Sequence, residues 1–253
     1  MGGLIVKKLT ILILLISIII CITGYNSSRK SVASSSSSSI LSEQKNYRIP
    51  LGEQKENYSV EDFKKIYLEY LKLNKIVLEN SPENDKTGMP KEDKLRYYTM
   101  LDITPKNVKT EIGCQIFKVN YTCETYVLYK SKLFQIGIGF GGFGLVSLAT
   151  CDFDGNKQKD IIYTFSWGSG LHRSQIGVFN FSKEIEERLN FVQMNKDIML
   201  EKASDNNFKI YNADVSSLDD GLDFINLKLI KKEHVADVKG NKGKIQVKKY
   251  NNK

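Results

Sequence analysis

Residues 137–181 read GIGFGGFGLVSLATCDFDGNKQKDIIYTFSWGSGLHRSQIGVFNF, and this stretch decides how the chain folds. Three segments of it, 145–150, 160–166 and 175–181, are rich in β-branched and aromatic residues. The loops between them are rich in Gly, Asp, Asn and Ser. This composition is typical of strands joined by short turns. The stretch therefore predicts an antiparallel sheet in the middle of the chain, with an acidic loop between its first two strands.

Strand-like composition continues on both sides of this stretch. Further strands are predicted over residues 114–121, 124–134, 197–201, 208–214, 223–230 and 244–250.

The region before the strands has a helical pattern. Residues 59–80 place apolar and aromatic side chains at a spacing of three and four, and Ser59 with Asp62 forms a capping box at the start. Short helices are also predicted over 94–101 and 184–191. The expected fold class is α+β, with a mostly antiparallel β-sheet body and one or two N-terminal helices.

Three regions are expected along the 253 residues. Residues 1–22 form a signal peptide or anchor, and residues 23–58 form a flexible tether that contains a run of six serines at 34–39. Residues 59–253 form a single α+β domain, helical over 59–101 and β-rich over 108–250.

The N-terminus carries an export signal. Lys7 and Lys8 precede an apolar segment over 9–22, which fits a signal-peptide core better than a membrane span of about 20 residues. Cys21 closes this core, with Ile18 three residues before it, and the arrangement resembles a bacterial lipoprotein signal. The resemblance implies lipidation at Cys21 and attachment to the cell membrane outside the cytoplasm. Ile20 stands where that family has a small residue, and cleavage after Ala33 with secretion, or an uncleaved anchor, are the alternatives.

Charge is concentrated at the C-terminal end. The net charge is +8, and residues 228–253 hold nine lysines against Glu233 and Asp237. Such an end could bind an anionic cell-envelope polymer or a lipid surface, or could simply be a solvated edge strand. The absence of arginine there, with Tyr250 as its one aromatic residue, argues against nucleic acid.

Cysteines and glycines point to structure rather than chemistry. Cys114 and Cys123 could form a disulfide or stay as buried thiols, and the sequence does not decide between them. The glycines at 137–144 fit G-x-G-x-x-G, but a β-prone segment follows where a nucleotide-binding fingerprint needs a helix. We therefore expect no nucleotide cofactor, and expect the glycines to serve close backbone approach.

The acidic loop has metal-ligand spacing. Asp152, Asp154, Asn156 and Asp160 occupy positions 1, 3, 5 and 9, and the carbonyl of Gln158 is available at position 7. Oxygens at alternate positions of a curled loop can converge on calcium. The alternative is a turn in which Asp and Asn act as turn formers and hold no ion.

This loop resembles the calcium loop of FG-GAP and VCBS-type repeats over about 30 residues. Phe143-Gly144 precedes a short strand, and the acidic loop and a second strand follow. The resemblance implies calcium held by the side chains of Asp152, Asp154, Asn156 and Asp160 and by the backbone of Gln158. Lys157 stands where that family has glycine.

A second candidate surface lies just after the sheet's second strand. Trp167, His172 and Arg173 flank the turn Gly168-Ser169-Gly170 and could recognise a sugar or an anion, or could be an ordinary hairpin with a packed tryptophan. No residue is assigned a catalytic role. We therefore expect an envelope protein that binds or supports other molecules, with a structural calcium loop. The alternative is an extracytoplasmic enzyme acting on a cell-wall or glycan substrate, and the sequence indicates no particular protein partner.

Overall fold

The computed structural model of the protein describes residues 40–41, 46–50, 54–75, 99–120, 122–217 and 227–250. The chain divides into two compact units, Met1–Ser36 and Ser37–Lys253, and all described residues lie in the second. The export signal, Cys21 and the serine run lie outside the described residues. Within the described part, no helix combines the length and apolar character needed to cross a membrane.

Most described residues belong to three antiparallel sheets. The first sheet has the order β2-β6-β5-β4-β3, the central sheet β1-β10-β9-β8-β7 and the last sheet β11-β12-β13-β14. The strands of the first sheet are β2 (Asn46–Arg48), β3 (Met100–Asp102), β4 (Gln115–Val119), β5 (Thr125–Tyr129) and β6 (Lys132–Ile136). Those of the central sheet are β1 (Ile40–Leu41), β7 (Gly144–Cys151), β8 (Asp160–Trp167), β9 (Arg173–Asn180) and β10 (Ile185–Met194). Those of the last sheet are β11 (Asp197–Ser204), β12 (Asn207–Ser217), β13 (Leu227–Asn241) and β14 (Lys244–Lys249).

Each sheet is built on one chain-order meander of four strands, namely β3–β6, β7–β10 and β11–β14. The strands β1 and β2 then add to the outer edges of two of these meanders. The described body is thus mostly antiparallel β, which confirms the expected β-rich fold class.

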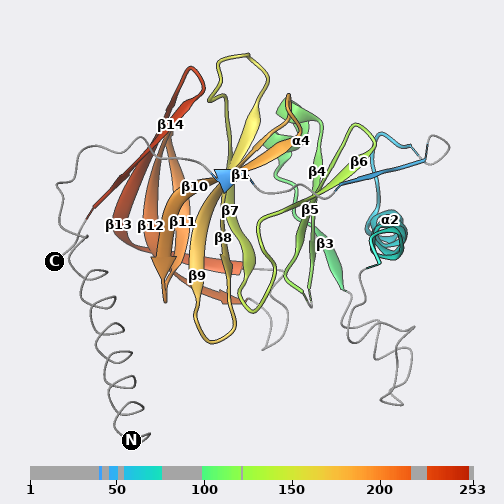
Figure 1. The fold of residues 1–253 in the computed structure, drawn as a ribbon, viewed down its shortest axis with the longest axis horizontal. Coiled ribbons are helices and arrows are strands. Elements are labelled where there is room, and N and C mark those ends of the chain that lie inside the picture. The colour runs from blue at the N-terminus through green and yellow to red at the C-terminus, as the bar shows by residue number, and fades with distance from the viewer. Residues whose placement is uncertain are drawn as a thin grey trace, which may run out of the picture. The chain divides into compact units, whose positions relative to one another are not determined.

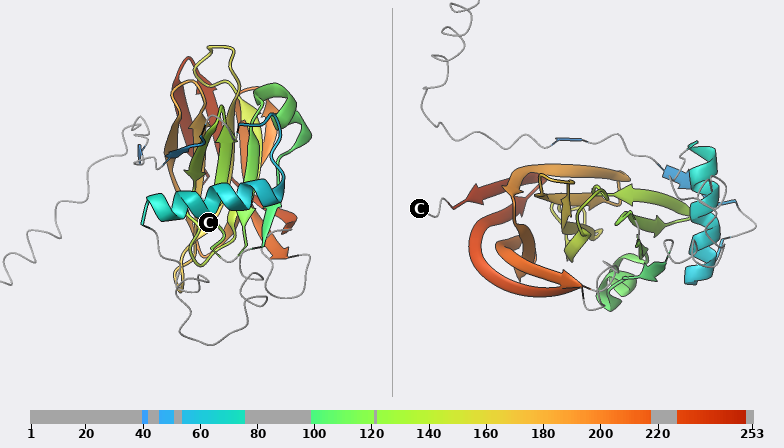
Figure 2. Two further views of the ribbon diagram at one scale, coloured as in Figure 1. Left: turned by 90° about the vertical axis from the view of Figure 1, so that its right-hand side faces the viewer. Right: turned by 90° about the horizontal axis from the view of Figure 1, so that it is seen from below.

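The layers follow the order α2 (Val60–Leu73), first sheet, central sheet, last sheet (Figures 1 and 2). Helix α2 lies across the strands of the first sheet, and Phe63 stacks on Phe117 with ring centroids 4.2 Å apart. Between the first and central sheets, Phe134 packs on Phe179 at 5.1 Å. Side chains of both faces of the central sheet are therefore removed from water.

Strand β8 shows why the central sheet is hydrophobic throughout. Ile161, Tyr163 and Phe165 face the core shared with the first sheet, whereas Ile162 faces the core shared with the last sheet. Successive side chains of a strand point to opposite faces, so a strand between two sheets needs apolar residues at nearly every position.

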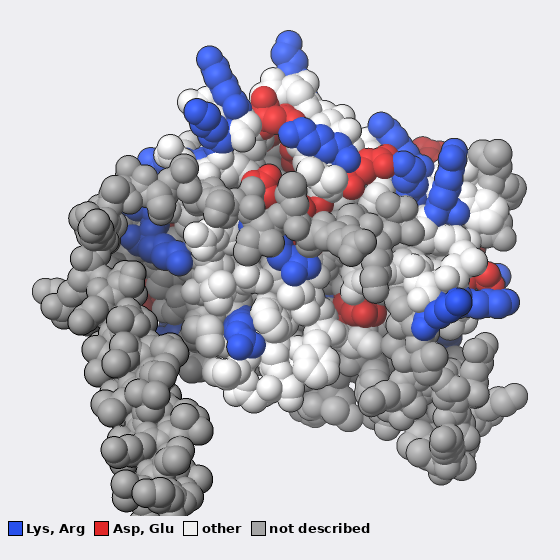
Figure 3. All heavy atoms as spheres, in the orientation of Figure 1, with Lys and Arg blue, Asp and Glu red and all other residues white. Residues whose placement is uncertain are grey.

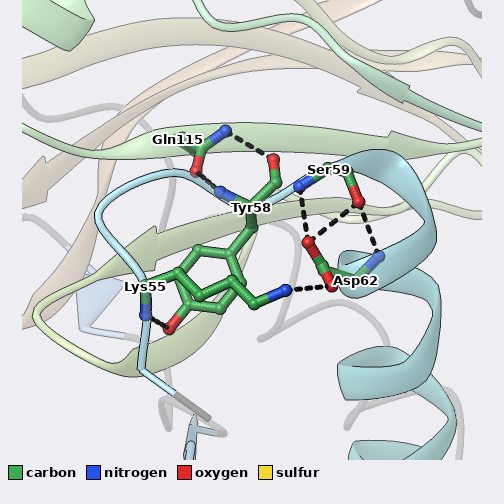
Figure 4. Close-up of polar contacts among 5 residues, drawn as sticks. All are labelled: Lys55, Tyr58, Ser59, Asp62 and Gln115. Carbon is green, nitrogen blue, oxygen red and sulfur yellow. Dashed lines mark hydrogen bonds and ion pairs between the residues drawn. The ribbon is translucent and has the colours of Figure 1, made fainter.

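The start of α2 is fixed by the predicted capping box (Figure 4). The hydroxyl of Ser59 accepts a hydrogen bond from the backbone N–H of Asp62 at 3.1 Å, and the Asp62 carboxylate accepts from the N–H of Ser59 at 3.0 Å. Just before it, the side chain of Gln115 bonds both the N–H and the carbonyl of Tyr58, at 2.7 and 3.0 Å. The helix is thereby tied to the first sheet at its N-terminal end.

The glycine run serves close approach between backbones, as expected. A Cβ at Gly139 would lie 2.5 Å from the Glu124 nitrogen, and a Cβ at Gly144 would lie 1.9 Å from the Cys123 carbonyl oxygen. Strand β7, not a helix, follows the run.

Several predicted boundaries were wrong. The segment 184–191 is not a helix but most of β10, because pairing with β9 and burial of Glu186 override its helical composition. The predicted strand 124–134 is a hairpin, with a turn at Lys130–Ser131 between β5 and β6.

The prediction that residues 59–101 are helical was also wrong at the end of this range. Its described end, Met100–Asp102, is strand β3, and the sequence analysis missed α4 (Lys106–Ile112). Pro105 before this helix and Gly113 after it, at φ 74°, are the signals that could have found it.

The flexible tether was predicted to extend too far. Residues 40–41 and 46–48 lie within 23–58, yet they pair with β10 and β6 as edge strands. Ile49 is buried as well.

Candidate functional site

The acidic loop, residues 152–159, connects β7 to β8 at the end of the sheets that lies uppermost in Figure 1. Two of its predicted ligands meet through a third residue. The amide nitrogen of Asn180 donates to Asp154 Oδ2 and to Asp160 Oδ2, at 3.0 Å each. The other oxygen of Asp160 accepts from the backbone N–H of Phe181 at 2.9 Å. Carboxylates from the two ends of the loop are therefore gathered at the end of β9.

The first ligand position is only partly satisfied. Asp152 Oδ2 accepts from the N–H of Lys157 at 3.2 Å, whereas Asp152 Oδ1 is buried with no hydrogen-bond partner among the described residues. The side-chain amide of Asn156 donates to Asp154 Oδ2 at 3.0 Å, and its side-chain oxygen Oδ1 accepts from the N–H of Gln158 at 2.7 Å. A buried carboxylate oxygen without a partner is costly unless something neutralises it.

Electrostatics in the loop favour added positive charge. Burial raises the pKa of Asp160 to about 7; the N–H of Phe181 lowers it, and the charges of Asp154 and Asp152 raise it further. Repulsion between carboxylates in a poorly solvated site can be relieved by a proton or by a cation.

The loop also joins all three sheets. Asn206, in the turn between β11 and β12, donates to the carbonyl of Asp152 at 2.7 Å and accepts from its N–H at 2.9 Å. The carbonyl of Phe153 accepts from the N–H of Gly243, in the turn between β13 and β14, at 2.7 Å. On the other side, the amide of Gln158 donates to the hydroxyl of Tyr129 in β5 at 3.0 Å.

Phe153 anchors the loop in the core of the last sheet. Its ring lies 5.8 Å from that of Phe208 and fills the space where Gly240 has no side chain, since a Cβ there would lie 1.8 Å from the ring. A change in the conformation of the acidic loop would therefore disturb the packing of two sheets.

The oxygen-rich loop fits a hard cation such as calcium in its chemistry. The orphaned oxygen of Asp152 and the carboxylates gathered on Asn180 support this fit. Even so, no three acidic, histidine or cysteine side chains of the described residues already surround a single point. Binding would therefore require Asp154 and Asp160 to give up their bonds to the side-chain amide of Asn180 and move toward the ion.

Lys157 occupies the backbone conformation expected for a glycine. Its φ is 70°, in the left-handed region that favours glycine. A lysine side chain at this position therefore strains the backbone of the loop.

Comparison with known proteins gives no relative. No protein-family model, no curated protein and no solved structure matches the chain. The site must be interpreted from its own geometry.

The second predicted surface is only partly assembled. The guanidinium of Arg173 lies 4.9 Å from the centre of the Trp167 ring, across the hairpin of β8 and β9. His172 turns elsewhere: its Nε2 lies 2.8 Å from Asp197 Oδ1, at the start of β11. Trp167 and Arg173 therefore form one contact, and His172 belongs to another.

The three cysteines of the domain are free and buried. Burial raises the pKa of Cys114 to about 12 and that of Cys123 to about 11. The two thiols are therefore protonated at neutral pH and unreactive.

The lysine-rich end forms two ordered strands, β13 and β14. Lys209, Asp237 and Lys248 form a cross-strand row on the outer face of the last sheet, with Lys239 and Lys244 on the same face. On the face shown in Figure 3, lysines and carboxylates gather along the upper edge, over the end of the sheets that carries the acidic loop.

The sequence analysis missed the residues that complete the acidic loop. Asn180 and Asn206 lie 20 and 46 residues beyond Asp160, at the end of β9 and in the turn between β11 and β12. Asparagine at a strand end or in a turn is common and gives no sign of which loop it contacts. Only the strand pairing brings these amides to the acidic loop.

Proposed function

We propose that this protein is an exported envelope protein, anchored to the cell membrane by its N-terminal segment, that acts as a binding or structural module stabilised by one calcium ion. The acidic loop is the calcium site in this proposal. Asp152, Asp154, Asn156 and Asp160 would hold the ion by their side chains, and Gln158 by its backbone.

One observation carries the calcium proposal. The loop brings Asp154 and Asp160 to one amide nitrogen and leaves Asp152 Oδ1 buried without a partner among the described residues. Calcium, when bound, supplies the positive charge that neutralises these three carboxylates. The arrangement of strands gives additional support, because the loop joins the first two strands of a four-stranded meander, the unit from which propeller folds are assembled.

The ion is proposed to be structural rather than catalytic. The loop contacts turns of the last sheet through Asn206 and Gly243 and reaches Tyr129 in the first sheet. An ion that fixes the loop would therefore fix the positions of the sheets around it.

Calorimetry of the fragment 37–253 tests the calcium site, since these residues form one compact unit. Calcium is expected to bind the wild-type fragment and to raise its melting temperature, whereas Asp154→Ala should lose both effects. Asp205→Ala removes an exposed carboxylate from a neighbouring turn and should bind as the wild type does. The absence of heat and of any thermal shift with millimolar calcium, in the wild type and Asp154→Ala alike, would disprove the site.

Expression of the full chain in a bacterium tests the anchor. Labelled fatty acid is expected to enter the wild-type protein in the membrane fraction and to be absent from Cys21→Ser. Ile20→Gly restores the small residue of the lipoprotein pattern and should increase the labelling. Unlabelled protein in the membrane would instead indicate an uncleaved anchor, and protein released into the medium would indicate secretion.

An enzyme acting on a cell-wall or glycan substrate is the alternative, and one contact favours it. His172 pairs with Asp197, which lines a surface hollow of about 420 Å³. A His–carboxylate pair beside a hollow could transfer protons. Release of reducing ends from cell-wall glycan by the wild type, abolished in His172→Ala, would establish this activity; no release would exclude it for that substrate.

Binding of an anionic polymer or lipid surface is a further alternative. It is favoured by Lys209, Lys239, Lys244 and Lys248, which share the outer face of the last sheet. Such binding should fall steeply with salt and should weaken in the double variant Lys244→Gln/Lys248→Gln. Binding that is indifferent to salt would contradict it.

A further inference from the structure

A groove lies at the side of the last sheet, away from the acidic loop. It consists of two adjoining hollows of about 490 and 420 Å³, which share Lys196, Asn212 and Glu233. The larger hollow is also lined by Phe191, Lys249 and Tyr250. We call these six residues the Asn212 groove.

Two bulges in β13 shape this groove. Between the pairs Ile210–Ala236 and Ala213–Lys231, β12 advances by three residues and β13 by five. Bulges bend a strand and redirect its side chains, and they are frequent beside binding sites. The two extra residues of β13 interrupt the regular alternation of its side chains. As a result, Glu233 lies beside Asn212.

Asn212 is the unusual residue of the groove. Its side chain is only 4% exposed, and its Nδ2 donates to Glu233 Oε2 at 3.1 Å. Its carbonyl oxygen Oδ1 is buried and accepts no hydrogen bond from the described residues. A buried amide oxygen without a donor costs free energy, and a ligand that donates to it would remove that cost.

The charges around the groove are balanced. Three lysines, Lys196, Lys232 and Lys249, stand against three carboxylates, Asp197, Asp214 and Glu233. Lys232 pairs with Asp214 at 3.0 Å, Asp197 also contacts His172 at 2.8 Å, and Glu233 accepts from Asn212. The groove therefore attracts neither strongly anionic nor strongly cationic ligands.

The polar groups select a ligand that donates and accepts at adjacent atoms. Asn212 Oδ1 requires a donor, and the ammonium groups of Lys196 and Lys249 require acceptors. A carboxylate or a phosphodiester has no proton to donate at neutral pH, and its negative charge would face Glu233. An apolar ligand would leave the amide unpaired. A hydroxyl group does both, and neighbouring hydroxyls repeat the pattern.

Val192, which lines the larger hollow and is 42% exposed, provides the apolar part, whereas the aromatic rings nearby are covered or turned away. Phe191 is 2% exposed, and Lys249 lies over its ring at 5.2 Å. The Tyr250 hydroxyl donates to Asp237 Oδ2 at 2.6 Å, and its ring lies 4.8 Å from that of His234, so the ring is held in place. These contacts and Lys248, which lies over the ring at 5.3 Å, place the Tyr250 ring on the outer face of the sheet, so only the edge of this residue borders the groove.

We propose that the Asn212 groove binds a neutral, hydroxyl-rich ligand, namely a saccharide chain. The proposal rests on the role of the protein as a binding module and is independent of the calcium loop. The hydroxyls of one sugar unit would pair with Asn212 and the lysines, and its C–H face would pack on Val192 in the wall of the larger hollow.

Calorimetric titration of the fragment 37–253 with maltohexaose and with the tetramer of N-acetylglucosamine tests this proposal. At least one of them is expected to bind saturably. Asn212→Ala should weaken binding at least tenfold. Lys209→Ala, on the outer face of the same strand as Asn212, should bind as the wild type does.

Amide NMR shifts of the wild-type fragment provide a test that needs no variant. The bound saccharide should shift the amides of Phe191, Lys196 and Tyr250 and leave that of Lys209 in place. Absence of saccharide binding by the wild type would overturn the proposal, as would equal binding by Asn212→Ala. Saturable binding of tetraalanine or polyphosphate in place of both saccharides would also overturn it. Titration with calcium and with a chelator separates this outcome from failure of the calcium site.

Discussion

Asp160 shows how one residue can link folding to pH and to an ion. Its side chain is 1% exposed, and it accepts hydrogen bonds from Phe181 and Asn180. Burial is the main cause that raises its pKa to about 7. At neutral pH it is therefore divided between a protonated form, which needs no ion, and a charged form, which a cation would stabilise.

The ion-free protein should lose stability as the pH rises from about 4 to about 7. Asp160 in the folded state keeps its proton up to about pH 7, whereas the unfolded chain releases it near 3.8. The folded state binds more protons across this window, so the free energy of unfolding falls with rising pH, by up to about 1.4 kcal/mol per pH unit.

Urea unfolding across this range with a chelator present measures the effect. Asp160→Asn should remove the Asp160 contribution and flatten the curve, and Asp205→Asn should leave it intact. A slope that is the same in Asp160→Asn and the wild type would contradict the assignment.

Replacing Lys157 by glycine should raise the free energy of unfolding. Its φ of 70° disfavours a side chain by about 1 kcal/mol, so Lys157→Gly should unfold at higher urea than Lys157→Ala. Both variants remove a positive charge from the loop and should bind calcium more tightly than the wild type. Equal stability of the glycine and alanine variants would show that the left-handed conformation is not maintained.

At the scale of elements, turns and strand edges position the acidic loop. The turn between β11 and β12 is hydrogen-bonded to the loop through Asn206, and the turn between β13 and β14 is hydrogen-bonded to it through Gly243. On the opposite side of the central sheet, β10 carries a buried polar network. Glu186 accepts from the N–H of Gly137 at 2.6 Å and from Arg188 at 3.0 Å.

Asn206→Ala should lower the free energy of unfolding by about 1–3 kcal/mol, because it breaks two hydrogen bonds to the backbone of Asp152. The neighbouring Asn207→Ala is the matched control, since Asn207 is half-buried like Asn206 and its side chain bonds Ser204 in its own hairpin. Similar losses of unfolding free energy in the two variants, measured by urea unfolding, would show that the hydrogen bonds of Asn206 to the loop do not stabilise the protein.

Glu186→Ala should cost about 3–5 kcal/mol, because it leaves Arg188 without its buried partner. The double variant Glu186→Leu/Arg188→Met removes both charges and should recover part of this loss. A double variant less stable than Glu186→Ala would contradict the view that the unpaired charge is the main cost.

The sequence was informative where structure is local and uninformative where it is not. The capping box of α2 and the strands around the acidic loop follow from neighbouring residues, and both were predicted. The segment 184–191 was misassigned because the partner strand β9, and not local propensity, decides its conformation. For the same reason the amides of Asn180, Asn206 and Asn212 carried no signal, since their roles depend on contacts across sheets.

At the scale of the whole domain, the acidic loop is the point where three sheets meet. It belongs to the central sheet, contacts two turns of the last sheet and reaches Tyr129 of the first. The groove at Asn212 lies on a different part of the last sheet, formed by β13 and its neighbours. We therefore expect the ion at one end of the sheets to support the fold and the groove at one side to bind the ligand.

Amide hydrogen exchange of the fragment 37–253, with calcium and with a chelator, tests the central claim most directly. The N–H groups of Lys157, Phe181 and Gly243 donate to the loop or to its carboxylates and represent contacts within the loop, with β9 and with the last sheet. Calcium is expected to slow the exchange of all three by at least about tenfold, which corresponds to roughly 1.4 kcal/mol of local stability. Asp152→Asn should abolish this protection. Exchange that is unchanged by calcium at all three amides would contradict an ion that fastens the sheets together.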